Sequence, residues 1–263
     1  MQTTATPGPI RVVGWHLATF RRLWKANVLS TFIQPMLYLL GLGVGVGSLV
    51  DRHSSNASAL GTSSYVAYVA PGMLITVAMS LGANESLWPI MGNLKWQRGY
   101  HGIAATPLEA RDIVLGHALW IAVRSAIAAT CVAIALACFP QTRAWGLLPS
   151  VLVSMTIGVA FAMPIMAYSI VAKEDSRFAA VNRFFVIPLF LFGGAFYPIS
   201  KLPIAVQWFA RFAPLWHGVV VARSFTSGHA ELAGTVGHIS YVAAWIVAGC
   251  VVAVHNLRKK LYP

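Results

Sequence analysis

The sequence predicts an all-α integral membrane protein with six transmembrane helices, an N-terminal amphipathic interfacial helix and an external re-entrant helical hairpin between spans five and six. Three observations lead to this fold class. Only 10% of the 263 residues are charged, whereas soluble domains average about 25%. The mean hydropathy is +0.69, and six apolar segments meet or approach the length of a membrane span. So few charges cannot cover a chain of this length in water, and lipid must therefore solvate much of its surface.

The predicted spans follow from length and apolar character. A hydrocarbon core about 30 Å thick requires roughly 20 apolar helical residues. The segments that meet or approach this length are 28–50, 65–87, 113–139, 147–172, 178–197 and 236–255. Prolines fall inside several spans, which membrane helices tolerate. Asn182 and Arg183 interrupt the start of the fifth span.

The distribution of cations predicts the orientation. With the N-terminus inside, thirteen of the 19 lysines and arginines lie on the inner side, five on the outer side and one, Arg124, within a span. This bias predicts a multi-pass protein with both termini in the cytoplasm and residues 1–263 as a single transmembrane domain. The net charge of +12 does not indicate nucleic acid, because no basic stripe with interleaved aromatic residues is present on a soluble module.

Residues 9–27 predict a basic amphipathic helix lying flat in the inner interface. Val13, Leu17, Phe20 and Trp24 fall within a narrow arc at about 100° per residue, and Arg11 and Arg22 project almost opposite. This helix is either a topology anchor or, in addition, a surface that contacts a cytoplasmic partner.

The segment 91–105 lies in the longest inner loop. It carries Lys95, Trp96, Gln97, Arg98 and Tyr100 within six residues, and a proline breaks the chain before the third span. A loop that only reversed the chain would need no exposed Trp96 or Tyr100. These rings are either interfacial anchors or contacts to another protein.

Residues 202–223 predict the external hairpin. Its two apolar pieces, about ten residues each and divided at Pro214, are too short to span, and they are typical of a re-entrant hairpin. Trp208, Phe212 and Trp216 would lie near the outer interface, as part of an aromatic belt or of a gate.

Arg124 is the most costly residue to place in a membrane, at about 2.5–3.5 kcal/mol for a helix centre. Glu85 is the only acid inside a predicted span. The depth difference between them is about 12 Å if the third helix starts at Ile113 and about 6 Å if it starts near His117. We expect the two to interact, either as a lock between helices or with a role in transport.

Several kinds of chemistry have no motif here. The sequence has no Gly-x-x-x-x-Gly-Lys-Ser/Thr phosphate loop, no His-Glu-x-x-His motif and no plausible Ser/His/Asp set. The three cysteines lack metal-like spacing. Because no loop has room for a nucleotide-hydrolysing domain, any ATPase must be a separate chain, and no cofactor is expected on this one.

Five sequence segments, in order along nearly the whole chain, resemble a known family. They are Tyr38-Leu-Leu-Gly-Leu-Gly-Val-Gly, Tyr68-Val-Ala-Pro-Gly-Met, Leu94-Lys-Trp-Gln-Arg, Ala105-Thr-Pro-Leu-Glu-Ala-Arg-Asp-Ile-Val-Leu-Gly116, and Pro188-Leu-Phe-Leu-Phe-Gly-Gly-Ala-Phe-Tyr-Pro198 with Leu202-Pro203. The chain resembles the permeases of type-2 ABC exporters, near the nodulation-factor exporter and daunorubicin-resistance permeases.

The resemblance implies a non-enzymatic permease subunit in the bacterial plasma (inner) membrane. It implies a dimer with a second permease, identical or homologous, and two ABC ATPase subunits that hold ATP and Mg. The exported substrate would be a drug, lipid or (lipo)saccharide, as in antibiotic efflux. The helix with Arg11, Trp15, Arg22 and Trp24 would be the connecting helix. Residues 91–105 would be the ATPase-coupling segment, and 202–223 the external re-entrant helices.

Two alternatives remain from other classes. An integral-membrane transferase would need His, Asp or Glu clustered at one membrane face, and the eight histidines are scattered along the sequence. An ion-coupled secondary transporter would favour internal repeats and several intramembrane acids, whereas the spans contain one acid and no convincing repeat.

Overall fold

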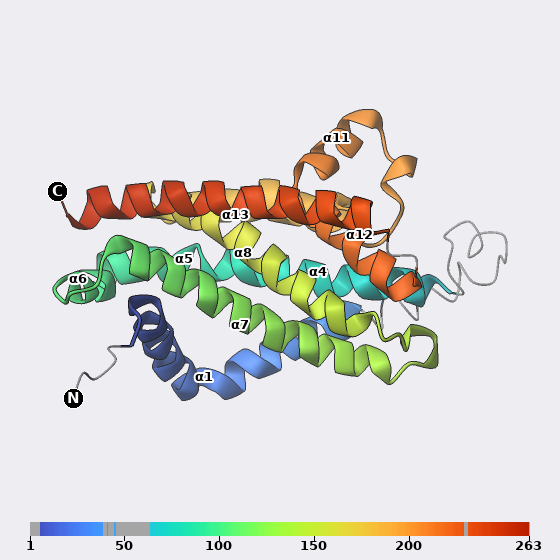
Figure 1. The fold of residues 1–263 in the computed structure, drawn as a ribbon, viewed down its shortest axis with the longest axis horizontal. Helices are drawn as coiled ribbons and strands as arrows, with labels where there is room; N and C mark the ends of the chain where they lie inside the picture. Colours follow the sequence, from blue (N-terminus) through green and yellow to red (C-terminus); the bar gives the residue numbers. More distant parts are fainter. Residues whose placement is uncertain (1–5, 39–40, 42–44, 46–63, 229–230, 263) are drawn as a thin grey trace.

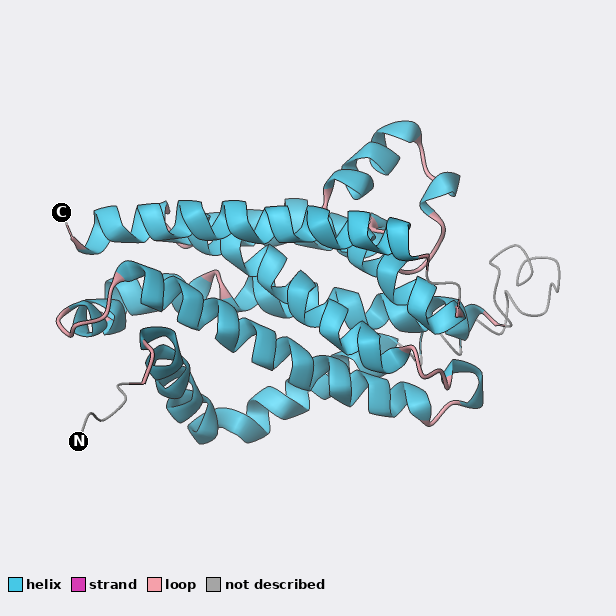
Figure 2. Cartoon of the chain, viewed as in Figure 1, coloured by secondary structure: helices cyan, strands magenta, loops and turns pink. Residues whose placement is uncertain are grey.

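The computed structural model describes residues 6–38, 41, 45, 64–228 and 231–262, and these residues are helical with no strand among them. Figure 2 shows that loops are confined to short connections, most of them at the two ends of the bundle. The α-helices are α1 (Gly8–Tyr38), α4 (Tyr65–Glu85), α5 (Trp88–Met91), α6 (Gly99–Ala104), α7 (Ala110–Ala137), α8 (Leu147–Val171), α9 (Ser176–Val181), α10 (Ile187–Phe192), α11 (Ile204–Phe212), α12 (Pro214–Ser227) and α13 (Leu232–Leu261). Short π-helical turns cover Gly92–Trp96 and Asn182–Val186, and 3₁₀ turns cover Pro140–Thr142 and Ile199–Lys201.

Helix α8 lies at the centre of the bundle. It packs against α4, α7, α12 and α13, and α1 packs on the outer side of α7. Figure 1 shows α1 changing direction, so that its first part crosses the bundle and its second part runs along it. Both termini and α6 lie at one end of the molecule, whereas α11 and α12 lie toward the other.

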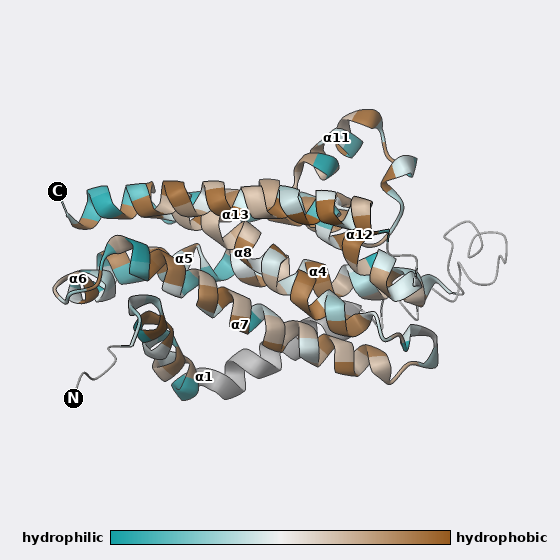
Figure 3. Cartoon of the chain, viewed as in Figure 1, coloured by the Kyte–Doolittle hydropathy of each residue, from teal (hydrophilic) through white to brown (hydrophobic). Residues whose placement is uncertain are grey.

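Four helical runs in the described residues are long and apolar enough to cross a membrane: Tyr65–Trp96, Ala110–Ala137, Leu147–Val171 and Leu232–Leu261. They correspond to the second, third, fourth and sixth predicted spans. Figure 3 shows apolar residues along the middle of these helices and hydrophilic residues at the C-terminal end of α13, where its last turn carries Arg258, Lys259 and Lys260. The protein is therefore a multi-pass helical membrane protein.

The second predicted span ends at residue 87, and helix α4 ends close to it, at Glu85. A turn at Ser86 and Leu87, where the Leu87 ψ of −97° is not helical, precedes α5 and the π-helical turn, which extend to Trp96. The chain remains largely helical after the sequence becomes polar, because intrahelical hydrogen bonds need no apolar surroundings.

The first and fifth predicted spans are not among the four long runs. Helix α1 covers residues 28–38 of the first predicted span, and most of residues 39–50 lie outside the described residues. The fifth is continuous helix only from Ser176 to Phe192, and it contains a π-helical turn at Asn182–Val186, where the sequence is interrupted by polar residues. It stops at Gly193 and Gly194, and Gly194 has a φ of 86°, which ends a right-handed helix.

Helices α4 and α8 cross in close contact at two glycines. An ideal Cβ on Gly82 would lie 2.1 Å from the carbonyl oxygen of Gly158. Such a contact is open only to a residue without a side chain, and small residues allow membrane helices to pack backbone to backbone. Gly116 has the same role where α1 crosses α7, because a Cβ there would lie 2.5 Å from the Cβ of Val12.

Candidate functional site

Arg124 of α7 and Glu85 at the end of α4 form an ion pair, as the sequence predicted. The Arg124 Nη2 and Glu85 Oε1 atoms are 3.3 Å apart, and the two side chains are 9% and 26% exposed. The helical segments after Glu85 extend eleven residues to Trp96, which places Glu85 further from the inner end of its run than expected. Helix α7 begins earlier than expected, at Ala110, which by itself would increase the depth difference. The first effect is the larger, so the two residues lie at similar depth.

A cavity of about 390 Å³ lies next to this ion pair, between α1 and the ends of α4 and α7. Its walls combine aromatic rings with polar groups. The lining residues are Trp15, His16, Thr19, Phe20, Glu85, Trp88, Pro89, Gly92, Asn93, Trp96, Gln97, Tyr100, His117, Trp120 and Arg124. We call this space the α1 cavity.

Helix α1 reaches the ion pair through its aromatic face. The Phe20 ring lies 4.7 Å from the guanidinium carbon of Arg124, and the His16 ring stacks on Trp120 at 5.5 Å between centroids. Burial lowers the pKa of His16, in the interfacial part of α1, to about 4, so this imidazole is uncharged at neutral pH. The ion pair is therefore enclosed by rings and by a neutral histidine.

Four polar atoms that line the α1 cavity have no hydrogen-bond partner among the described residues: His16 Nε2, Asn93 Oδ1, Tyr100 Oη and His117 Nδ1. His117 is held by its other ring nitrogen, Nε2, which lies 3.1 Å from the Ser86 hydroxyl. A buried polar group without a partner costs about 1–3 kcal/mol. No local pattern in the sequence predicts this cluster, because its members are up to 101 positions apart.

The predicted coupling segment forms a corner beside the cavity. Lys95, Trp96, Gln97 and Arg98 are exposed there, Trp96 to 63%. The Lys95 ammonium donates a hydrogen bond to the Lys173 carbonyl. Arg98 has a φ of 52°, which breaks the helical run before α6 begins. The corner thus presents an aromatic ring, an amide and two cations at the end of the bundle.

The expectation that Tyr100 is exposed is wrong. Tyr100 is completely buried, and its ring lies 6.2 Å from that of Trp15 in α1. An ideal Cβ on Gly99 would approach the Trp15 ring to 3.3 Å, so the start of α6 fits closely under α1. Tyr100 therefore faces its own chain and is not available to a partner at this surface.

Only part of the predicted apolar arc of α1 faces the bundle. Leu17 is 46% exposed and is available to lipid, whereas Val12 is buried and His16 and Phe20 face the bundle. Arg11 and Arg22 are exposed as expected, and the side chain of Trp24 lies outside the described residues. The face that contacts α7 is thus rotated by about one residue, because α1 packs on protein as well as on lipid.

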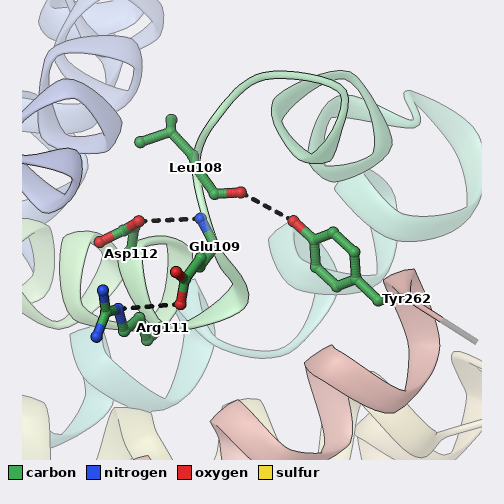
Figure 4. Close-up of polar contacts among 5 residues, drawn as sticks. All are labelled: Leu108, Glu109, Arg111, Asp112 and Tyr262. Carbon is green, nitrogen blue, oxygen red and sulfur yellow. Dashed lines mark hydrogen bonds and ion pairs between the residues drawn. The ribbon is translucent and has the colours of Figure 1, made fainter.

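A set of polar contacts ties the C-terminal end of α13 to the start of α7 (Figure 4). The Tyr262 hydroxyl donates to the Leu108 carbonyl at 2.8 Å. Glu109 and Asp112 form a capping box at the start of α7, and Arg111 pairs with Glu109 at 3.1 Å. The capping-box signature has Ser or Thr at the N-cap, so Glu109 gives no such signal, and nothing local in the sequence predicts the tyrosine contact.

The predicted hairpin forms two short helices, α11 and α12, which join at Ala213 before Pro214. Trp208 and Phe212 are 66% and 64% exposed, and Trp216 is half-buried. Tyr241 of α13 donates to the Phe212 carbonyl at 2.6 Å. The hairpin therefore contacts α13 while leaving two aromatic rings exposed.

Two further contacts hold α12. The Nδ1 atoms of His217 and His238 are 2.7 Å apart, and His217 Nε2 lies 2.9 Å from the Arg211 carbonyl. Burial lowers the pKa of His217, and the neighbouring His238 adds to this effect. Arg223 donates to the carbonyls of Tyr68, Gly194 and Ala195 at 3.1–3.3 Å. Neither contact was predicted from the sequence.

These features define a class of protein: a multi-pass helical membrane protein with an aromatic and basic corner at one end of its spans. In the part of the chain that the structure describes, no group of three His, Cys, Asp or Glu residues is placed to hold a metal ion. The ABC-2 type transporter family model matches residues 13–225. The chain belongs to this family of membrane transport permeases.

Named relatives agree with this assignment. Nodulation protein J of Rhizobium leguminosarum bv. trifolii is 31% identical over 265 residues, covering 98% of this chain and 97% of the relative. Nodulation protein J of Rhizobium meliloti (strain 1021) is 30% identical over 258 residues, covering 95% of each. The inner membrane transport permease YadH of Escherichia coli (strain K12) is 25% identical over 206 residues, covering 76% and 71%. No solved structure matches the chain.

Proposed function

We propose that this chain is the transmembrane permease subunit of an ATP-driven exporter, coupled to two separate ABC ATPase subunits that bind ATP and Mg. Family membership supports a transport role and gives no support to a transferase. The observation that carries the coupling is the exposed corner at Trp96–Arg98. It lies at the end of the helical run that also contains Glu85, so a partner seated there would contact a helix continuous with the bundle.

The membrane arrangement in this proposal has six spans, with α1 and the α9–α10 run as the first and fifth. Both termini and the corner would face the bacterial cytoplasm, in keeping with the cation bias. The hairpin α11–α12 would be re-entrant from the outer side. It is supported by the lengths of the two helices, 9 and 14 residues, which are too short to span.

A second permease, identical or homologous, would cover part of the exposed apolar surface. The membrane-spanning window of α13 is only 17% buried, against 72% for the run that starts with α4. Phe184 and Val251 are 78% and 63% exposed. Such a surface is available to lipid and to a partner subunit. The pathway between two permeases would carry an amphipathic substrate, namely a drug, a lipid or a (lipo)saccharide.

The test of the proposal combines co-purification with transport. The wild-type chain, expressed with the ABC ATPase of its own cell, should purify with that ATPase from detergent. W96A/R98A should lose most of the substrate-stimulated ATPase activity while inserting normally. The matched control is W145A/R143A, which removes the same residue types from the opposite end of the bundle, where Trp145 is 90% exposed. Unchanged activity in W96A/R98A, or equal loss in the control, would reject the coupling role.

A further inference from the structure

The α1 cavity has polar as well as aromatic walls. Four of its lining residues, His16, Asn93, Tyr100 and His117, each carry one N or O atom without a hydrogen-bond partner among the described residues, but these atoms are themselves inaccessible to solvent. The charged groups that an occupant could reach belong to Glu85, with a side chain 26% exposed, and Arg124, at 9%. The Glu85–Arg124 pair is therefore the polar centre of the cavity.

The walls indicate an organic molecule rather than water alone. Four tryptophans, Trp15, Trp88, Trp96 and Trp120, line the space together with Phe20. Pockets for organic ligands have volumes of about 300–1,000 Å³ and mostly aromatic or apolar walls with a few polar groups. The α1 cavity, at about 390 Å³, has this size and this mixture.

The charges of the cavity select the kind of ligand. Among the described lining residues, Arg124 and Glu85 are the two that carry formal charge, so the site is neutral overall. A ligand with a net charge would bring an uncompensated charge into a buried space, which is costly. A ligand with one positive and one negative group would match both side chains.

Each of the two charged residues has capacity left for a ligand. One guanidinium nitrogen of Arg124 contacts Glu85, and a guanidinium has five N–H donors in a fork that suits phosphate. Glu85 is a carboxylate beside aromatic faces, and carboxylates and aromatic rings together attract ammonium groups.

The depth of the site fits a lipid headgroup. Helix α4 has 21 residues from Tyr65 to Glu85, which is about 30 Å and matches the thickness of the hydrocarbon core. If Tyr65 lies at one boundary of the core, Glu85 lies at the other, where phosphates of the lipid leaflet are found. Tryptophans are enriched at this level.

We propose that the α1 cavity binds a zwitterionic phosphate–ammonium headgroup, with the phosphate at Arg124 and the ammonium at Glu85 and the surrounding aromatic faces. Phosphatidylethanolamine, whose primary ammonium can donate hydrogen bonds to Glu85, is the leaflet lipid that we assign to the site. The site is formed within one chain, so the proposal does not depend on coupling to an ATPase.

Native mass spectrometry of the delipidated full chain in detergent tests the proposal. The probes are dioleoyl phosphatidylethanolamine, dioleoyl phosphatidylglycerol and soluble phosphoethanolamine. The wild type should bind one phosphatidylethanolamine at least tenfold more tightly than phosphatidylglycerol. Binding of phosphoethanolamine as tight as that of the lipid would assign the same site to a soluble ligand. Equal binding of the two lipids would overturn the proposal.

Two variants separate the charge argument from simple loss of structure. E85Q leaves the cavity with one net positive charge, so its preference should reverse toward the anionic phosphatidylglycerol; an unchanged preference would overturn the proposal. E231Q, which neutralises an exposed acid at the other end of the bundle, is the matched control and should bind like the wild type.

Discussion

Replacement of Gly82 by alanine is the sharpest test of how α4 and α8 pack. The added Cβ would lie 2.1 Å from the Gly158 carbonyl oxygen and 2.9 Å from its carbonyl carbon. Because both are backbone atoms, no side-chain rotation relieves the contact, and the helices must separate by about 1 Å to reach an ordinary distance. Overpacking of this kind costs about 1–3 kcal/mol, occasionally more, and we expect G82A at the upper end of that range.

The assay is the melting temperature of the purified protein in detergent, followed by size-exclusion chromatography after heating. G237A in α13 is the matched control, because nothing lies within 4 Å of a Cβ at Gly237. That change should leave stability unaltered or raise it by about 0.5–1 kcal/mol through helix propensity. Equal melting temperatures for G82A and G237A would refute the packing described for these two helices.

Three other predictions follow from polar contacts. E85R and R124E should each lower the free energy of unfolding by about 3–5 kcal/mol, because breaking a buried pair leaves one charge unpaired. The E85R/R124E swap should restore most of the lost melting temperature, and no recovery would argue against the pair. Burial lowers the pKa of His217, so the folded state resists protonation of this histidine. The contact of His217 with α13 should therefore be fully formed at a pH above the ordinary histidine pKa of about 6.5, and it should weaken as the pH falls below that pKa. Hydrogen exchange of α11 and α12 at pH 7.5 and 5, expressed as protection factors relative to the intrinsic exchange rate at each pH, measures this effect, and lower protection at the higher pH would contradict it. Y262F removes the hydrogen bond to Leu108 and should cost about 1 kcal/mol, visible as faster exchange before α7; unchanged exchange there would show that the contact contributes nothing.

The long apolar helices could be predicted well from the sequence. The third and fourth spans were expected at 113–139 and 147–172, and the structure has α7 at Ala110–Ala137 and α8 at Leu147–Val171. Their ends coincide with changes of composition. The second span was expected at 65–87 and α4 ends at Glu85, but hydropathy does not predict the short helical segments that follow as far as Trp96.

The Glu85–Arg124 pair could also be predicted, because a cation inside a span requires a partner and the spans offer one acid. The rest of the α1 cavity could not. His16 and His117 are 101 positions apart in the sequence, yet their ring centroids are 5.4 Å apart. Tyr100 was expected to be exposed because the sequence cannot show that Trp15 covers it. Burial of these groups is set by the path of α1, which has no local signature.

The length of α4 has a consequence for its tilt in the membrane. Its 21 residues measure about 31 Å along the axis, which is close to the thickness of a typical hydrocarbon core. Helix α8, with 25 residues, is about 6 Å longer. In the same bilayer α8 should therefore tilt more than α4, because tilting accommodates a helix longer than the core.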